Sequence, residues 1–227
     1  MLDIIGKEDY FQAFDQRLAD RSFHSLKGIQ DAWVLLQLQG KKDLKIAEIG
    51  GGESRVLQLA KQQNEVWNID KLEGAGKGPT EVSDTSAIKL VRSYMGDFDP
   101  NIPDNYFDIL LSISVVEHVP ADKLTDFFKD CHRVLKPGGL MLHAIDIYIY
   151  GTPGNREVVD RYRSIVEQLG FEWEQPPVIN KDVSFKTSHA SNSDLTMAHW
   201  NRMAPNLKQL RTVAQSVSIK LAATKKN

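Results

Sequence analysis

The 227-residue sequence lacks the features that mark several protein classes. It contains a single cysteine, Cys131, which excludes an internal disulfide and favours a reducing compartment. No apolar run approaches the ~18–20 residues of a membrane span, and no basic–apolar–small signal pattern opens the chain. We therefore expect a cytoplasmic protein that does not engage a membrane.

Charge of one sign is also lacking, because 28 basic and 30 acidic residues leave a net charge of −2. This balance gives no electrostatic reason to expect a nucleic-acid partner. The chain has no H-x-x-x-H or C-x-x-C spacing, so we expect no metal. It also has no G-x-S-x-G motif, which argues against an α/β-hydrolase. With 41% hydrophobic and 26% charged residues, the composition is that of an ordinary globular domain.

From Leu44 onward, strand and helix patterns alternate, which predicts a doubly wound α/β sheet with helices on both faces. The predicted strands are residues 45–49, 65–69, 93–95, 107–112, 140–145, 171–173 and 214–221. The predicted helices are residues 55–63, 84–91, 121–135 and 157–169, and Lys225–Asn227 is expected to fray.

The flanks of this alternation are harder to interpret. Residues 1–43 are predicted to form an N-terminal helical cap, with two helices between Lys7 and Gly40 and a break at 21–26. This cap either covers the binding site or only packs on the outside of the sheet. Residues 44–227 would form the main domain, with substrate-side loops at 147–155 and 180–203 and short helices at 195–203 and 206–210.

The stretch Leu44–Ser54, LKIAEIGGGES, is the most informative motif of the chain. A buried strand runs into Gly50, Gly51 and Gly52, and an acid, Glu48, precedes them. A second acid, Asp70, ends the next apolar run, where a carboxylate can accept hydrogen bonds from ribose hydroxyls. This is the layout of a nucleotide-binding crevice at the carboxyl edge of a parallel sheet.

The details of this crevice separate two ligand classes. A dinucleotide fingerprint requires a third glycine where this chain has Arg55. The carboxylates Glu48 and Glu53 flank the glycines and suit a cationic ligand better than a pyrophosphate. S-adenosylmethionine carries a sulfonium and an ammonium group and has no phosphate.

On these residues the chain resembles the class I S-adenosylmethionine-dependent methyltransferases, over about residues 45–146. Glu48, Gly50 and Gly52 match the first motif of that family, whereas Ser54 stands where a last glycine is usual. The resemblance implies a mostly parallel seven-stranded Rossmann-like sheet with an antiparallel last strand. It also implies S-adenosylmethionine as the cofactor.

Further cofactor-binding residues follow from the resemblance. Asp97 would accept from the adenine amino group and Phe98 would pack on the ring; the alternative is an ordinary turn before Asp99-Pro100. The end of the fourth strand would touch the methionine part or the adenosine, through Ser112, Ile113 and Ser114. Lys71, also a candidate, begins the glycine-rich loop 71–83, which is either a wall beside the adenosine or a plain surface loop.

The catalytic candidates are His118 and Asp146, at the ends of the fourth and fifth strands. His118 is a candidate base because a free histidine titrates near ~6.5, and the alternative is a structural or substrate-positioning role. His143 is interpreted as a core histidine. The hypothesis is methyl transfer to an oxygen or nitrogen of a small molecule, such as a sugar or a natural product. The alternatives are a non-catalytic S-adenosylmethionine-binding sensor or partner subunit, and an NAD-dependent oxidoreductase. The sequence leaves the oligomeric state open.

Overall fold

The structure is a computed structural model that describes residues 1–18, 26–74, 78–83, 86–150, 154–178 and 214–227. Its helices are α1 (Lys7–Asp15), α2 (Leu26–Leu38), α3 (Arg55–Ala60), α4 (Leu124–Val134) and α5 (Gly154–Gln168), with a 3-10 turn, η2 (Val116–His118). Its strands are β1 (Leu2–Ile4), β2 (Lys45–Ile49), β3 (Glu65–Ile69), β4 (Ile88–Val91), β5 (Phe107–Ile113), β6 (Leu135–Tyr150), β7 (Phe171–Trp173) and β8 (Ala214–Lys225).

These strands form one sheet in the order β1-β8-β6-β5-β2-β3-β4, with β7 also paired to β8. Strands β2 to β6 are parallel and β8 is antiparallel to β6, which confirms the doubly wound fold with an antiparallel last strand. From β2 the chain winds outward to β3 and β4, then returns to β5 and winds the other way. The order reverses between β2 and β5, and ligands bind at the carboxyl edge of such a point.

Within the described ranges the sheet has eight strands rather than the predicted seven. The additional strand is β1, which lies within the predicted N-terminal cap and pairs with β8 through Leu2↔Leu221. Its three residues are too few to show a period in the sequence.

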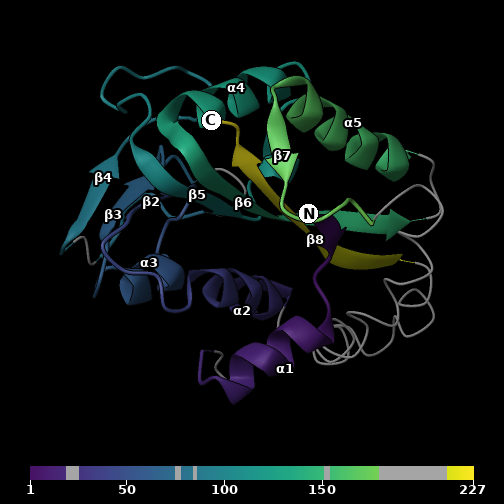
Figure 1. Cartoon of the computed structure of the whole chain (residues 1–227), viewed down its shortest axis with the longest axis horizontal. Coiled ribbons are helices and arrows are strands. Elements are labelled where there is room, and N and C mark those ends of the chain that lie inside the picture. The colour runs from purple at the N-terminus through teal and green to yellow at the C-terminus, as the bar shows by residue number, and fades with distance from the viewer. Residues whose placement is uncertain (19–25, 75–77, 84–85, 151–153, 179–213) are drawn as a thin grey trace.

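Helices α4 and α5 cover one face of the sheet, and α2 and α3 cover the other (Figure 1). On α4 the buried side chains recur at helical spacing, and they face Ile145 and Ile147 of β6 within one core cluster. Leu142 and Ala144 of β6 lie in the opposite cluster with α2 and α3. Successive side chains of β6 therefore alternate between the two faces of the sheet.

The predicted helix at 84–91 and the predicted strand at Ser93–Met95 are wrong. The strand is β4, Ile88–Val91, which pairs in parallel with Val66–Ile69 of β3. As an edge strand with three of its four side chains only half-buried, β4 has no clear apolar alternation. Ala87 precedes it with φ of 59°, which is incompatible with a helix.

The predicted loop at 147–155 is also shorter than expected. Strand β6 continues to Tyr150 and α5 begins at Gly154. The extension has a partner, because β8 pairs with β6 as far as Tyr150↔Ala214. The antiparallel neighbour thus supplies hydrogen bonds beyond the end of the parallel strands.

Lys225, predicted to fray, is 8% exposed and is the last residue of β8. Its Nζ donates to Asn105 Oδ1 (2.7 Å) and to the carbonyls of His132 (2.8 Å) and Leu135 (2.9 Å). The prediction was wrong because these acceptors come from segments far away in the sequence.

The predicted loop 180–203 and the helices at 195–203 and 206–210 lie outside the described residues, as does most of the predicted break at 21–26. In the ranges that are described, no helix has the length and hydropathy that crossing a membrane requires.

Candidate active site

Three consecutive glycines form the turn after β2, where the strand order reverses. Gly50 (φ 63°) and Gly52 (φ 49°) have left-handed backbone conformations. A Cβ on Gly50 would lie 2.7 Å from Cγ2 of Val115, in the segment after β5. A Cβ on Gly52 would lie 2.9 Å from Cγ of Pro79. The turn therefore requires glycine for its backbone and for the close approach of two neighbouring segments.

The Glu48 carboxyl group lies beside this turn and is 3% exposed. It accepts a hydrogen bond from the Ser54 hydroxyl. Ser54 also caps α3, because its Oγ accepts from the Leu57 N–H at 2.9 Å. Burial raises the pKa of Glu48 to about 7, against the opposing effects of the Ser54 hydrogen bond and the Lys27 charge. The serine that departs from the family pattern is thus both a helix cap and the partner of Glu48.

Arg55, which stands where a dinucleotide fingerprint has its third glycine, pairs with Asp31 of α2. Its Nε lies 2.8 Å from Asp31 Oδ2, and its Nη2 contacts the same oxygen. Burial raises the pKa of Asp31, and Arg55 partly offsets this effect. The pair attaches α2 to the start of α3, which a glycine could not do.

Asp70 follows β3 directly and its side chain shapes the glycine turn. Oδ2 accepts from the Gly52 N–H at 2.9 Å, and Oδ1 accepts from the Leu72 N–H at 2.7 Å. The residue is only half-buried, and a carboxylate oxygen can accept more than one hydrogen bond. Asp70 can therefore hold the turn and still accept from two vicinal hydroxyls.

Lys71 is half-buried and lies 4.0 Å from Glu73 Oε1. Glu73 Oε2 accepts from the Tyr94 hydroxyl at 3.0 Å. These contacts connect the loop after β3 to the segment after β4, so the two segments form one side of the candidate site.

Asp97 and Phe98 lie on that side, in the turn between β4 and β5. Both are exposed, and the Phe98 side chain remains 44% exposed although it is a large apolar group. Phe98 has φ of 54°, an uncommon conformation for an aromatic residue. Its N–H donates to Oδ2 of Asp130 on α4 at 3.1 Å. An exposed aromatic ring next to an exposed carboxylate suits a planar heterocycle with an amino group.

Ser112, at the end of β5, points into the core. It is fully buried, and its Oγ lies 2.7 Å from His143 Nδ1. Burial lowers the pKa of His143 to about 3, so this histidine is neutral at physiological pH. The interpretation of His143 as a core residue fits this environment. The Ser112 side chain therefore does not face the candidate site, contrary to the prediction.

The next two residues contact α2. Ile113 is buried, and its carbonyl accepts from Lys27 Nζ at 3.2 Å. Ser114 has φ of 55°, and its Oγ donates to Gln30 Oε1 at 3.0 Å. The N-terminal segment therefore reaches the carboxyl edge of the sheet through α2.

Asp146, at the carboxyl side of β6, belongs to the same hydrogen-bonded group. Its Oδ1 accepts from Gln30 Nε2 at 2.5 Å, and its Oδ2 lies 3.4 Å from Ser114 Oγ. Gln30 Nε2 also donates to Ser218 Oγ at 2.8 Å. Burial raises the pKa of Asp146, and the Lys27 charge and the Gln30 hydrogen bond oppose this effect.

His118 and Glu117 lie side by side on η2 but face different surroundings. His118 is exposed, whereas Glu117 is partly buried with both carboxyl oxygens inaccessible. Neither oxygen has a hydrogen-bond partner among the described residues. Burial first, and then the charge of Asp146, raise the pKa of Glu117 to about 8. Of this pair, the inward-facing group is Glu117.

The structure therefore brings most of the predicted residues to one edge of the sheet. Sequence reasoning missed four residues that meet them there or support them: Lys27, Gln30, Glu117 and Asp130. Gln30 and Asp31 are the two polar residues within the otherwise apolar stretch from Ile29 to Leu36 of α2, and this pattern could have indicated them. No group of three metal-ligating side chains occurs in the part of the chain that the structure describes.

Comparison with known proteins identifies the domain. Residues 47–143 match a family model described as a methyltransferase domain. Residues 47–143 are therefore similar to methyltransferase domains, as the motifs of the sequence predicted. A sterol 24-C-methyltransferase of Neurospora crassa is 29% identical over 128 residues, covering 52% of this chain and 32% of that protein. A polyamine aminopropyltransferase of Prochlorococcus marinus is 27% identical over 127 residues, covering 46% of this chain and 41% of that protein. The chain thus spans less than half the length of these curated relatives.

The fold also has a counterpart among solved structures along nearly the whole chain. Phosphoethanolamine N-methyltransferase 2 of Haemonchus contortus, solved with S-adenosyl-L-methionine, superposes with a TM-score of 0.59. The match covers 96% of this chain and 56% of that one, at 17% identity. At this identity, the likeness shows the shared fold.

Proposed function

We propose that this methyltransferase domain binds S-adenosylmethionine and transfers its methyl group to an oxygen or nitrogen of a small molecule. The observation that carries the proposal is the set of groups at the carboxyl ends of adjacent strands. The glycine turn follows β2, Asp70 follows β3, and Phe98 follows β4. This set fits a nucleoside that carries a positive charge, because carboxylates and an exposed ring face it, and no cluster of cations does so among the described residues.

When bound, the cofactor would supply a methyl group that is already activated by the sulfonium. The glycine turn, Asp70 and Phe98 would hold that cofactor, and an acceptor that took the methyl group would have to release a proton. The protein's contribution is then to hold both partners in line, exclude water and receive that proton.

The residues available for this last task are Glu117 and His118 on η2, after β5, and Asp146 within β6. Asp146 is partly buried and hydrogen-bonded to Gln30, and Glu117 has no partner among the described residues. A carboxyl group whose pKa is about 8, as for Glu117, can exchange protons near neutral pH. We propose that Glu117 joins Asp146 and His118 as a candidate base or acceptor-binding residue.

The choice of a small-molecule acceptor rests on charge. The net charge is −2, so the protein as a whole offers a polyanion such as a nucleic acid no electrostatic attraction. The names of the proteins similar to this chain, which refer to a sterol and to phosphoethanolamine, are consistent with small acceptors of different chemistry.

Two measurements test the proposal. Titration calorimetry should detect binding of S-adenosylhomocysteine and no binding of NAD. Transfer of a labelled methyl group should then be followed over panels of hydroxyl, amine and carboxyl acceptors. Binding of NAD without S-adenosylhomocysteine would refute the proposal. Binding of S-adenosylhomocysteine without turnover on any panel would support a non-catalytic sensor instead.

A further inference from the structure

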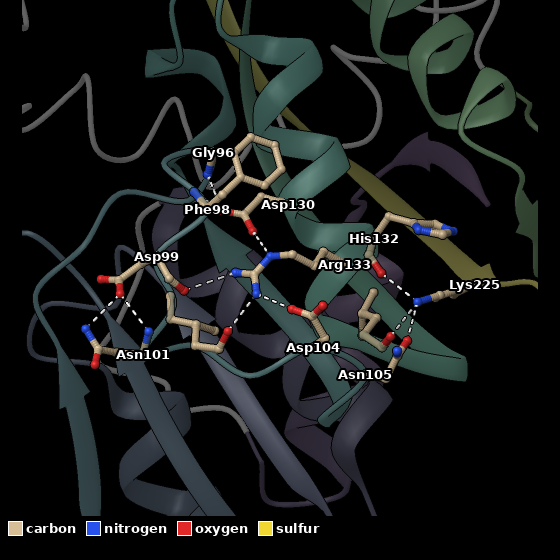
Figure 2. A network of polar contacts seen from close by, with 12 residues as sticks. Gly96, Phe98, Asp99, Asn101, Asp104, Asn105, Asp130, His132, Arg133 and Lys225 are labelled. Carbon is tan, nitrogen blue, oxygen red and sulfur yellow. Dashed lines mark hydrogen bonds and ion pairs between the residues drawn. The ribbon is translucent and has the colours of Figure 1, made fainter.

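The turn that carries Asp97 and Phe98 is held from its inner side by an ion pair on α4, formed by the buried Asp130 and the partly buried Arg133. Asp130 is 0% exposed, and Arg133 follows it one helical turn later. Figure 2 shows the two side chains between α4 and the loop that joins β4 to β5. A fully buried carboxylate is costly unless it is paired and hydrogen-bonded, so its partners indicate what it is for.

All partners of Asp130 are hydrogen-bond donors. Oδ2 accepts from the Gly96 N–H (2.7 Å) and from the Phe98 N–H (3.1 Å). Oδ1 accepts from Arg133 Nε at 2.8 Å. One carboxylate oxygen thus holds the two amides that flank Asp97, and this fixes the direction in which Asp97 and the Phe98 ring project.

Arg133 holds the continuation of the same loop. Its Nη1 donates to the Ile102 carbonyl (2.7 Å) and to Asp104 Oδ1 (2.5 Å), and its Nη2 donates to the Asp99 carbonyl at 3.3 Å. The guanidinium group therefore connects Asp130 to residues 99–104 (Figure 2). A lysine could not make these bonds together, because it lacks the planar fork.

Close packing supplies the remaining constraint. Gly96 has φ of 104°, and a Cβ there would lie 3.1 Å from the backbone nitrogen of Phe127 on α4. The turn consequently rests directly on the helix backbone. Phe98 is held at a positive φ and stays exposed although burial of its ring would be favourable.

We infer that Asp130 and Arg133 are positioning residues that set the recognition of the adenine base by holding Asp97 and Phe98 in place. The inference rests on the proposed function. It adds that selectivity for the adenine amino group depends on α4, which does not itself lie at the carboxyl ends of β2 to β4. Neither residue touches the ligand; each acts through the turn.

The test uses Asp130→Asn in the full chain. An asparagine must direct its NH2 group either at Arg133 or at the two backbone amides, and in both cases donor faces donor. Calorimetry would measure affinity for S-adenosylhomocysteine and for S-inosylhomocysteine, in which the amino group is replaced by an oxo group. We expect the affinity for S-adenosylhomocysteine to fall about tenfold while that for the inosine analogue changes little, so that the preference between them is lost.

Two further variants complete the design. Gly96→Ala displaces the turn from α4 without removing a charge, and it should also reduce the preference for S-adenosylhomocysteine over the inosine analogue. If Asp130→Asn does not fold, Gly96→Ala tests the inference in its place. Arg163→Met removes an exposed pair on α5, where Arg163 Nε lies 2.9 Å from Glu167 Oε1, and it should leave both affinities unchanged.

The outcomes separate the inference from the proposed function. If the wild-type protein does not bind S-adenosylhomocysteine, the proposed function fails. If it binds and folded Asp130→Asn keeps the wild-type preference, only the positioning role is refuted. A purely structural role would lower the melting temperature and weaken both ligands by the same factor, which also refutes the inference.

Discussion

Replacement of Glu117 by glutamine should change how stability depends on pH. Burial and the charge of Asp146 raise the pKa of Glu117 from 4.5 to about 8, so the folded protein binds this proton more tightly than the unfolded chain does. The stabilisation is fully present below pH 4.5 and is lost as the pH rises to about 8. Glutamine has no proton to lose, so the variant lacks this decline.

The magnitude follows from the same pKa difference. A rise from 4.5 to about 8 corresponds to at most ~5 kcal/mol of linkage. Glu117 is not fully buried, and screening by solvent reduces the expected effect to about 1–3 kcal/mol. Relative to wild type, Glu117→Gln should gain this amount between about pH 5 and about pH 9.

Urea denaturation across that pH range would measure the effect for both proteins. Glu48, whose pKa is raised to about 7, contributes to the slope of both curves and cancels in their difference. Glu172→Gln is the matched control, because Glu172 is exposed and only 3.6 Å from the exposed Lys226. Parallel curves for the wild type and Glu117→Gln would show that the carboxyl group is solvated or paired, and would refute the reasoning.

Three further outcomes are expected. Asp70→Ala should reduce the affinity for S-adenosylhomocysteine by about 1–3 kcal/mol, because both ribose hydroxyls would lose their acceptor; unchanged affinity in calorimetry would contradict the ribose role. Ser54→Ala should lower the free energy of unfolding by about 1–2 kcal/mol, since the cap of α3 and the partner of Glu48 disappear together; equal urea midpoints would argue against the cap. Lys225→Met should cost about 2–3 kcal/mol, because three acceptors lose their donor. Lys226→Met should change stability by less than ~0.5 kcal/mol, and a similar loss in both lysine variants would contradict the role of Lys225.

Local patterns determined the central part of the fold. Strand β2, the glycine turn, Asp70 and strand β5 were located from the sequence, because an apolar run, a set of turn residues and a helix start lie within a few residues of one another. The family motifs lie in this part of the chain for the same reason. The backbone of this turn requires glycine at Gly50 and Gly52, so its geometry could be predicted from the residue types alone.

The surroundings of the site were decided by tertiary structure alone. Three of its hydrogen bonds join residues that are far apart in the sequence. Asp130 and Gly96 are separated by 34 residues, Gln30 and Asp146 by 116, and Lys225 and Asn105 by 120. No local pattern encodes such contacts, since they depend on how α2, α4 and β8 pack against the sheet. The same holds for β4, which is a strand because β3 offers it an edge, and for Glu117, which faces inward while its neighbour His118 faces the solvent.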